Sequence, residues 1–232
     1  MDTYRTEEEQ VVAIKGFVAN HGSKILAVII VCIAIVLGVQ GYLEKQSAHK
    51  ASASGLFNQM AAQVDQSGLA PNAEKLAIID ASYQSLITDY SDTIYAVYGN
   101  FLQAKLAVSA GQLEAANGYL TWVVNNASNN EMLALANLRL GQLAFAQNKL
   151  EEALTIATKN AAPFQRQYYS LEGDIYVAQG DKDRALLAYQ KSQAAAESAG
   201  LAVDQMLSLK ITSLTPADED QLVKPVTTEG SK

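Results

Sequence analysis

The segment from Leu171 to Ser192 reads LEGDIYVAQGDKDRALLAYQKS, and its pattern determines the expected fold. Gly180 separates two stretches whose apolar residues recur at three- and four-residue spacing, as in two helices joined by a tight turn. A small residue, Gly173, lies seven positions before this turn, and Ala185 lies five positions after it. Two antiparallel helices need small residues where their axes approach closely. The segment therefore predicts a helical hairpin.

The same arrangement occurs three times when the turn residues Gly111, Asn148 and Gly180 are aligned, at intervals of 37 and 32 residues. A small residue precedes each turn and an alanine follows it; the six positions are Ala104, Gly141 and Gly173, then Ala116, Ala153 and Ala185. Repeated hairpins stack into a solenoid, in which each hairpin buries its apolar face against the next. Because the two ends of a stack need covering, helices before Tyr95 and after Leu201 are expected to act as caps.

The region from Glu44 to Leu214 is predicted to be all-α. It is rich in Ala, Leu and Gln, and it lacks the sustained alternation of apolar and polar residues that is typical of strands. Its two prolines, Pro71 and Pro163, both occur at expected helix junctions. We therefore expect a helical-repeat domain over residues 44–214 and a disordered tail over residues 215–232.

An apolar segment precedes this domain. Residues Ile25 to Leu43, ILAVIIVCIAIVLGVQGYL, contain no charge, and twelve of the 19 are Leu, Ile or Val. At 1.5 Å per residue such a helix is about 28 Å long, which matches a hydrocarbon core of about 30 Å. The segment therefore predicts a transmembrane helix in contact with membrane lipid.

A cleaved signal peptide is the alternative to a permanent anchor. The 24 residues before the apolar segment carry four acidic and three basic residues, whereas a signal peptide needs a short basic start. The favoured interpretation is an uncleaved signal-anchor with a cytoplasmic N-terminus and an exported C-terminal domain, which in a bacterium is periplasmic. The numbers of Lys and Arg on the two sides of the segment do not decide this orientation. The preference for this orientation rests on the short, charged N-terminal head remaining in the cytoplasm while the long C-terminal domain is exported.

Residues 1–24 are expected to form a cytoplasmic head with an amphipathic helix. Its apolar residues have helical spacing and follow an acidic start; they are Val11, Ile14, Phe17 and Val18. The run Asn20-His21-Gly22 is expected to end this helix. Two interpretations stay open, since the helix could lie on the bilayer or dock onto another membrane protein.

Composition excludes several classes of function. A net charge of −7 provides no basic surface for nucleic acid. The single cysteine, Cys32, cannot form an intramolecular disulfide, and the two histidines, His21 and His49, lie on either side of the apolar segment. The repeat domain therefore offers no histidine-based metal site or nucleophile.

The paired carboxylates of the repeat domain, Glu151 with Glu152 and Asp181 with Asp183, occur where helices are expected to begin and are explained by capping. No catalytic, metal-binding or cofactor-binding residue is predicted, and the chain is not expected to be an enzyme.

The repeat positions are those that define the tetratricopeptide repeat. The third copy supplies Gly173, Tyr176, Gly180, Asp181, Ala185 and Tyr189, and the second supplies Leu140, Gly141, Ala144 and Ala153. The layout as a whole, with the opening YRTEEEQVVAIKGFVANHG and the segment YSDTIYAVYGNFLQAKLAV, resembles the YfgM family of bacterial inner-membrane proteins over residues 1–214. The resemblance implies a single-pass ancillary subunit of the SecYEG translocon. It also implies association with the membrane-anchored chaperone PpiD and transfer of emerging chains to periplasmic chaperones.

The inner face of a tetratricopeptide solenoid is lined by the first helix of each hairpin, and this face is the predicted partner-binding site. The groove positions of the repeat correspond to Tyr98, Phe101, Lys105, Leu138, Gln142, Phe145, Ser170, Asp174 and Val177. The face is largely apolar, and with only Lys105 as a cation it does not suit a clamp for a terminal carboxylate. Phe101, Leu138 and Phe145 also fit a role in the core. A second hypothesis is a membrane-anchored regulator or sensor of one defined protein partner, such as one in envelope-stress signalling.

Overall fold

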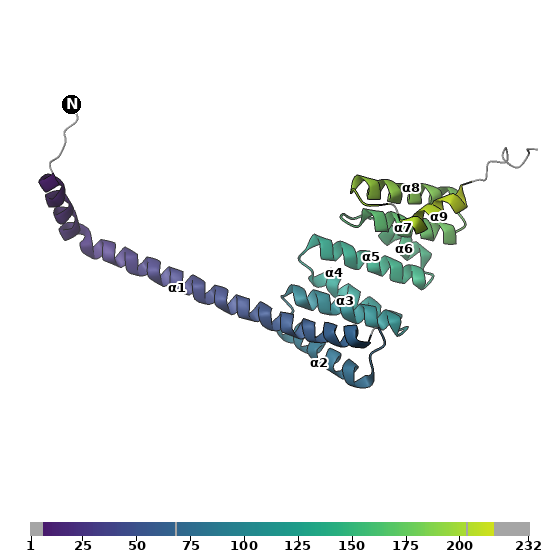
Figure 1. Cartoon of the computed structure of the whole chain (residues 1–232), viewed down its shortest axis with the longest axis horizontal. Helices are drawn as coiled ribbons and strands as arrows, with labels where there is room; N and C mark the ends of the chain where they lie inside the picture. Colours follow the sequence, from purple (N-terminus) through teal and green to yellow (C-terminus); the bar gives the residue numbers. More distant parts are fainter. Residues whose placement is uncertain (1–6, 68, 203, 216–232) are drawn as a thin grey trace, which may run out of the picture. The chain divides into compact units, whose positions relative to one another are not determined.

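A computed structural model describes residues 7–67, 69–202 and 204–215. This part of the chain is α-helical and contains no strand, which confirms the predicted fold class. The helices are α1 (Glu7–Ser67), α2 (Ala73–Asp89), α3 (Ile94–Ser109), α4 (Leu113–Asn126), α5 (Asn130–Ala146), α6 (Leu150–Ala157), α7 (Gln165–Ala178), α8 (Lys182–Ser198) and α9 (Gln205–Leu214) (Figure 1). The tail predicted over residues 215–232 lies outside the described residues, apart from Thr215.

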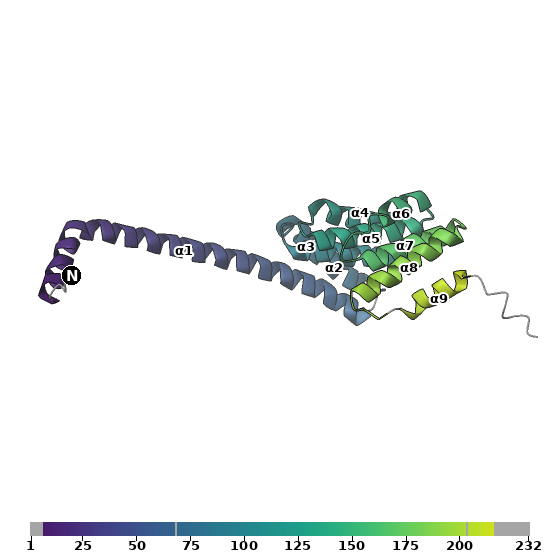
Figure 2. The ribbon, with the colours of Figure 1, turned by 90° about the horizontal axis from the view of Figure 1, so that it is seen from above.

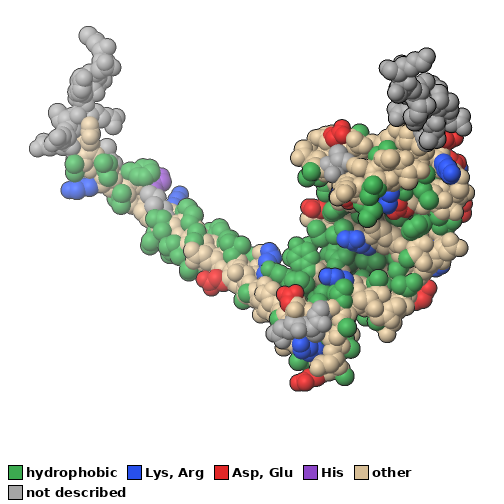
Figure 3. All heavy atoms as spheres, turned by 45° about the vertical axis from the view of Figure 1, so that its right-hand side comes forward, with side chains coloured by type: hydrophobic (Ala, Val, Ile, Leu, Met, Phe, Trp, Pro, Cys, Tyr) green, Lys and Arg blue, Asp and Glu red, His purple; other side chains and the backbone are tan. Residues whose placement is uncertain are grey.

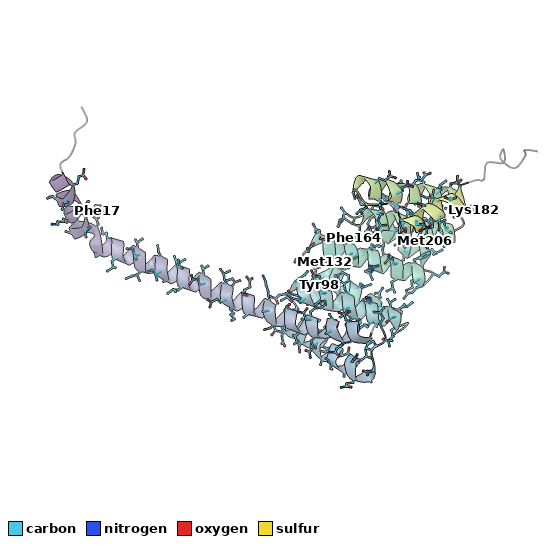
Figure 4. All side chains as sticks on the ribbon, viewed as in Figure 1. Phe17, Tyr98, Met132, Phe164, Lys182 and Met206 are labelled. Atoms are coloured by element: carbon cyan, nitrogen blue, oxygen red, sulfur yellow. The ribbon has the colours of Figure 1, made fainter. Side chains whose placement is uncertain are left out.

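The chain divides into two compact units, residues 1–55 and residues 56–232. Helix α1 belongs to both, because it continues without interruption from Glu7 to Ser67. The prediction that the first helix ends at residues 20–22 is therefore wrong. The helix instead bends near its N-terminal end, close to Phe17 (Figures 1 and 4). Gly22 and Ser23 follow there, and adjacent Gly and Ser residues are a common cause of helix bends.

The apolar section of α1 is long and apolar enough to cross a membrane. Its large side chains are exposed all around the helix, as Ile30 (58%) and Leu37 (62%) illustrate. A helix that is apolar on every side needs an apolar environment on every side. By length and composition, α1 is the one candidate span among the residues that the structure describes.

The second unit is a stack of helical hairpins. The last turns of α1 lie beside α2, where Ser82 donates a hydrogen bond to Gln59 of α1 (3.2 Å), and Met60 of α1 and Leu86 of α2 both lie near Gly99 of α3. The pairs α3–α4, α5–α6 and α7–α8 follow (Figure 2). Helix α9 packs against α8 through Leu207, which is 4% exposed. The hairpin before Tyr95 and the helix after Leu201 thus occupy the two end positions predicted for caps.

Three tight turns join the paired helices, and all three have the same geometry. Gly111, Asn148 and Gly180 take positive φ values of 73°, 59° and 79°. The residue after each turn donates its N–H to a carbonyl of the preceding helix; these bonds are Gln112 to Ala107 (2.8 Å), Lys149 to Ala144 (2.9 Å) and Asp181 to Tyr176 (2.9 Å). This is the Schellman arrangement, which requires a left-handed residue after the helix. The alignment of the three turns predicted from sequence is confirmed.

The small residues beside the turns lie where helices meet. The alanines after the turns, Ala116, Ala153 and Ala185, are fully buried. A Cβ atom on Gly141 would lie 3.0 Å from Leu171 Cδ2, so the neighbouring side chains would have to shift to admit even a methyl group. This confirms the close-packing role predicted for these positions.

Helix α6 is shorter than its counterparts and ends at Ala157. Thr158 donates its hydroxyl to the carbonyl of Leu154, Asn160 takes a positive φ of 45°, and Pro163 follows. Each of these features opposes a further helical turn. The sequence register alone did not predict this early end.

Candidate functional site

The nine predicted partner-binding residues lie on α3, α5 and α7, the first helices of the three hairpins. Their exposure differs, and it divides them into three groups. Tyr98, Lys105 and Val177 are exposed; Phe101, Gln142, Phe145, Ser170 and Asp174 are partly exposed; Leu138 is buried. The structure therefore leaves eight of the nine side chains at least partly accessible, and their role in binding remains a prediction.

The three apolar residues that also fitted the core differ from one another. Leu138 is 2% exposed and belongs to the core cluster that includes Tyr168 and Ile175. Its side chain stabilises the stack and is not available at the surface. Phe101 and Phe145 each pack one side against a core cluster and keep part of the ring accessible.

An aromatic cluster lies at the N-terminal end of the stack. Phe57 comes from the last turns of α1, and Tyr95 and Tyr98 come from the first two turns of α3. The centroid of the Phe57 ring lies 6.3 Å from that of Tyr95 and 5.7 Å from that of Tyr98, and the two tyrosine rings are 6.2 Å apart. Tyr98 is 36% exposed (Figure 4). The cluster therefore presents aromatic surface to the solvent at one end of the predicted site.

Sequence reasoning found Tyr98 and missed the other two members of this cluster. Tyr95 lies three residues before Tyr98, and this spacing places both rings on one face of a helix, so a signal was present. No comparable signal exists for Phe57. It joins the site only because α1 continues beyond the apolar segment into the first hairpin.

The C-terminal end of the predicted site is polar. Asp174 accepts a hydrogen bond from the Tyr189 hydroxyl (2.6 Å) and forms an ion pair with Lys210 of α9. The Lys210 ammonium also lies 5.3 Å from the centre of the Tyr189 ring. Burial raises the pKa of Tyr189, and its hydrogen bond to the Asp174 carboxylate raises it further. Asp174 is thus held by residues of α8 and α9, which joins the cap to the last repeat.

Most of the sequence matches the model of a known protein family. The model of the family described as tetratricopeptide repeat-like domain matches residues 15–216. The chain belongs to this family. The match includes the apolar section of α1 as well as the hairpins.

Several curated proteins of similar length are related to this tetratricopeptide repeat-like chain. A protein of Aggregatibacter actinomycetemcomitans is 29% identical and covers 90% of this chain and 97% of its own length. Proteins of Haemophilus influenzae and Neisseria gonorrhoeae are each 26% identical, covering 91% and 89% of this chain and 99% and 91% of their own lengths. All three are named ancillary SecYEG translocon subunit. The resemblance to the YfgM family is confirmed.

The tetratricopeptide repeat-like domain carries few cations near its predicted site. Lys105 is exposed on α3, and Arg139 on α5 donates a hydrogen bond to Gln142 (2.9 Å). Sequence reasoning overlooked Arg139, although it lies three residues before a predicted groove position. Figure 3 shows hydrophobic side chains on the surface of the domain with a small number of Lys and Arg side chains among them. Such a surface suits apolar or mixed segments better than a carboxylate terminus.

The paired carboxylates lie at helix starts. Asp181 accepts from the Arg184 N–H (2.9 Å) and forms an ion pair with the Arg184 side chain (2.6 Å). These hydrogen bonds lower the pKa of Asp181. Glu151 and Glu152 lie in the first turn of α6. Among the residues that the structure describes, His, Cys, Asp and Glu form no group of three that could hold a metal ion.

Proposed function

We propose that this protein is a non-enzymatic, membrane-anchored adaptor of the Sec translocon. In this proposal α1 crosses the inner membrane, the head is cytoplasmic and the repeat domain is periplasmic. The repeat domain binds emerging secretory or membrane proteins and links them to periplasmic chaperones such as PpiD. The names of the relatives support the association with SecYEG, and the apolar section of α1 supports attachment to the membrane.

The aromatic cluster of Phe57, Tyr95 and Tyr98 is the observation that carries the binding role. Aromatic rings offer a large contact area and lose little conformational entropy on binding, because two torsion angles fix the side chain. Their faces accept apolar side chains of different shapes, while the tyrosine hydroxyls can pair with a backbone. This chemistry fits a binding surface for chains of varied sequence, which an adaptor for emerging proteins requires.

Photocrosslinking in native membranes tests the proposal. A photoreactive residue is placed at Tyr98 or at Val177, the exposed groove positions at the two ends of the predicted site. Leu187 is a matched control, because it is equally apolar and 52% exposed but lies on α8, the second helix of its hairpin. We expect adducts with translocon subunits, PpiD and emerging chains from Tyr98 and Val177 and few from Leu187. Equal adducts from all three positions would contradict a specific groove.

The same experiment distinguishes the regulator hypothesis. A single stoichiometric adduct, unchanged when protein synthesis is blocked, would indicate one defined partner. Loss of adducts after translation stops would instead support emerging chains as ligands.

The proposed orientation has a separate test. The chain contains a single cysteine, Cys32, so replacing it with serine and introducing Ser198→Cys creates one exposed thiol on the repeat domain. A membrane-impermeant maleimide should label this thiol in intact spheroplasts. Labelling that requires lysis would place the domain in the cytoplasm.

A further inference from the structure

The first turns of α1 carry an apolar stripe on one side of the helix. Its members are Val11 (49% exposed), Ile14 (63%), Phe17 (57%) and Val18 (54%). At 100° per residue these four side chains fall within an arc of about 120°, whereas Val12 (70% exposed), Gly16, Ala19 and Asn20 lie outside it. Four of the five large apolar side chains of this section thus share one side of the helix, whereas the section that follows is apolar on every side.

Two exposed lysines accompany the stripe. Lys15 follows Val11 by one full turn and lies next to it at one edge of the arc, and Lys24 follows Gly22 and Ser23 at the start of the apolar section. Lysines at such positions suit a helix at a bilayer surface, because the long side chains reach the phosphates while the stripe enters the acyl layer.

His21 belongs to the same side of the helix. Its ring stacks on the Phe17 ring, with the centroids 4.9 Å apart, and its Nδ1 lies 3.3 Å from the Phe17 carbonyl oxygen. The His21 ring thus extends the apolar stripe with a polar aromatic ring, just before Gly22 and Ser23. Aromatic rings with a polar edge favour the interface between headgroups and acyl chains.

The bend in α1 separates this section from the apolar one (Figures 1 and 4). Without a bend, a helix that crosses the bilayer would carry its N-terminal turns straight out into water. With it, the amphipathic turns can follow the membrane surface while the next turns cross.

We propose that residues 10–24 of α1 lie in the interfacial layer of the membrane that the same helix crosses, with the apolar stripe facing the acyl chains and Lys15 and Lys24 at the lipid phosphates. Lipid is the occupant because the stripe is covalently continuous with the candidate span, so the bilayer is always present at high effective concentration. The inference is independent of the translocon role and of which side of the membrane the head occupies.

Site-directed spin labelling of the full-length protein in vesicles tests this. In a Cys32→Ser background, the variants Val18→Cys and Asn20→Cys place a nitroxide on the stripe and on the opposite side of the helix. The vesicles contain phosphatidylethanolamine and phosphatidylglycerol. Collision with oxygen reports lipid exposure, and collision with a nickel chelate reports water exposure. We expect the oxygen-to-nickel ratio to be several-fold higher at residue 18 than at residue 20, and to oscillate with the helical period along residues 10–20.

Two results would overturn the proposal. High nickel access at both positions would place the helix in water. Low access to both reagents at residue 18 would place it against a protein, either another subunit or a second copy of this chain. A label at Leu37→Cys controls for insertion, since it must remain inaccessible to nickel in every preparation.

A second variant tests the stripe directly. Phe17→Ser removes its largest side chain, so nickel access at residue 18 should rise several-fold while access at residue 37 stays low. Unchanged access at residue 18 would show that the stripe does not hold the helix in the interface.

Discussion

Gly173 of α7 lies against the ring of Tyr189 on α8. A Cβ atom at Gly173 would overlap the ring carbons, closer than real Cβ atoms approach a neighbour. Tyr189 cannot easily retreat, because it is 2% exposed and its hydroxyl is held by Asp174. This contact sets the distance between the two helices of the last hairpin.

Replacing Gly173 with alanine should therefore destabilise the repeat domain, although alanine is the better helix former. Overpacking of this kind typically costs about 1–3 kcal/mol. Denaturant unfolding of the full-length protein in detergent, followed by the fluorescence of the single tryptophan Trp122, measures the effect. Gly118→Ala is the matched control, because nothing lies within 4 Å of a Cβ there and the same change should stabilise α4 slightly. Equal effects of the two variants would contradict the packing role of Gly173.

The turn residues with positive φ predict that two variants of Asn148 differ in stability. Asn148 takes φ 59° at the position where the other two turns have glycine. Asn148→Gly should keep or raise the stability of the domain, because glycine adopts this conformation freely. Asn148→Ala should lower it by about 1 kcal/mol, because alanine lacks the short polar side chain that allows asparagine to adopt the left-handed conformation. The two unfolding midpoints in urea check this, and a midpoint for Asn148→Ala at or above that of Asn148→Gly would refute it.

How far the sequence predicts this structure depends on the range of the interactions. The turns at Gly111, Asn148 and Gly180 follow from local backbone requirements, so their alignment was enough to find them. The close contact at Gly173 follows from residue size alone. These local features were enough to predict the three hairpins.

Features that depend on distant parts of the chain were not predictable in the same way. Phe57 reaches the aromatic cluster because α1 is continuous through the expected domain boundary, and no local pattern indicates that continuity. Leu138 has the spacing of a groove residue, yet the neighbouring hairpin buries it. The bend in α1 was mistaken for a helix end, because Gly22 can serve either purpose.

The buried tyrosines predict an alkaline limit to stability. Burial raises the pKa of Tyr83 to about 12 and raises the pKa of Tyr168 and Tyr189 as well. In the unfolded chain these phenols ionise near pH 10, so above that value the unfolded state loses protons that the folded state keeps. Between pH 8 and about pH 10 these phenols should leave stability unchanged, and stability should fall as the pH rises toward 12. Unfolding midpoints measured between pH 8 and pH 12 test whether stability falls in this pH range.

Tyr83→Phe isolates the contribution of one phenol. This variant loses the hydrogen bond from the Tyr83 hydroxyl to Asn100 Oδ1 (2.9 Å), so it should be less stable at pH 8 by about 1 kcal/mol. Its stability should nevertheless fall less steeply between pH 10 and pH 12 than that of the parent, because one ionising group is gone. Parallel curves for the two proteins would show that Tyr83 does not contribute to the alkaline transition.

The ion pair between Asp174 and Lys210 should hold α9 without contributing much to global stability. Both side chains are about one-third exposed, and ion pairs at such positions typically contribute less than about 1 kcal/mol. Lys210→Met should leave the main unfolding transition nearly unchanged but speed amide exchange in α9, which packs on the stack mainly through Leu207. Hydrogen exchange resolved by peptide distinguishes the two effects. Exchange in α9 as slow as in the parent would mean that the apolar contacts alone fix the cap.

Tyr98→Ala provides the sharpest test of the binding surface. Its ring contacts Phe57 and Tyr95 but remains 36% exposed, so removing it takes aromatic area from the surface and little from the core. Truncation of an aromatic residue in a binding surface often costs more than about 1 kcal/mol of binding free energy, which corresponds to a five- to tenfold loss of affinity. We expect a loss of this size in the recovery of partner proteins from gently solubilised membranes, with the unfolding midpoint nearly unchanged. Leu187→Ala is the control, because it removes an exposed apolar side chain from α8 and should leave the recovery of partner proteins unaffected. An equal loss of recovery in both variants would place the binding surface elsewhere on the domain.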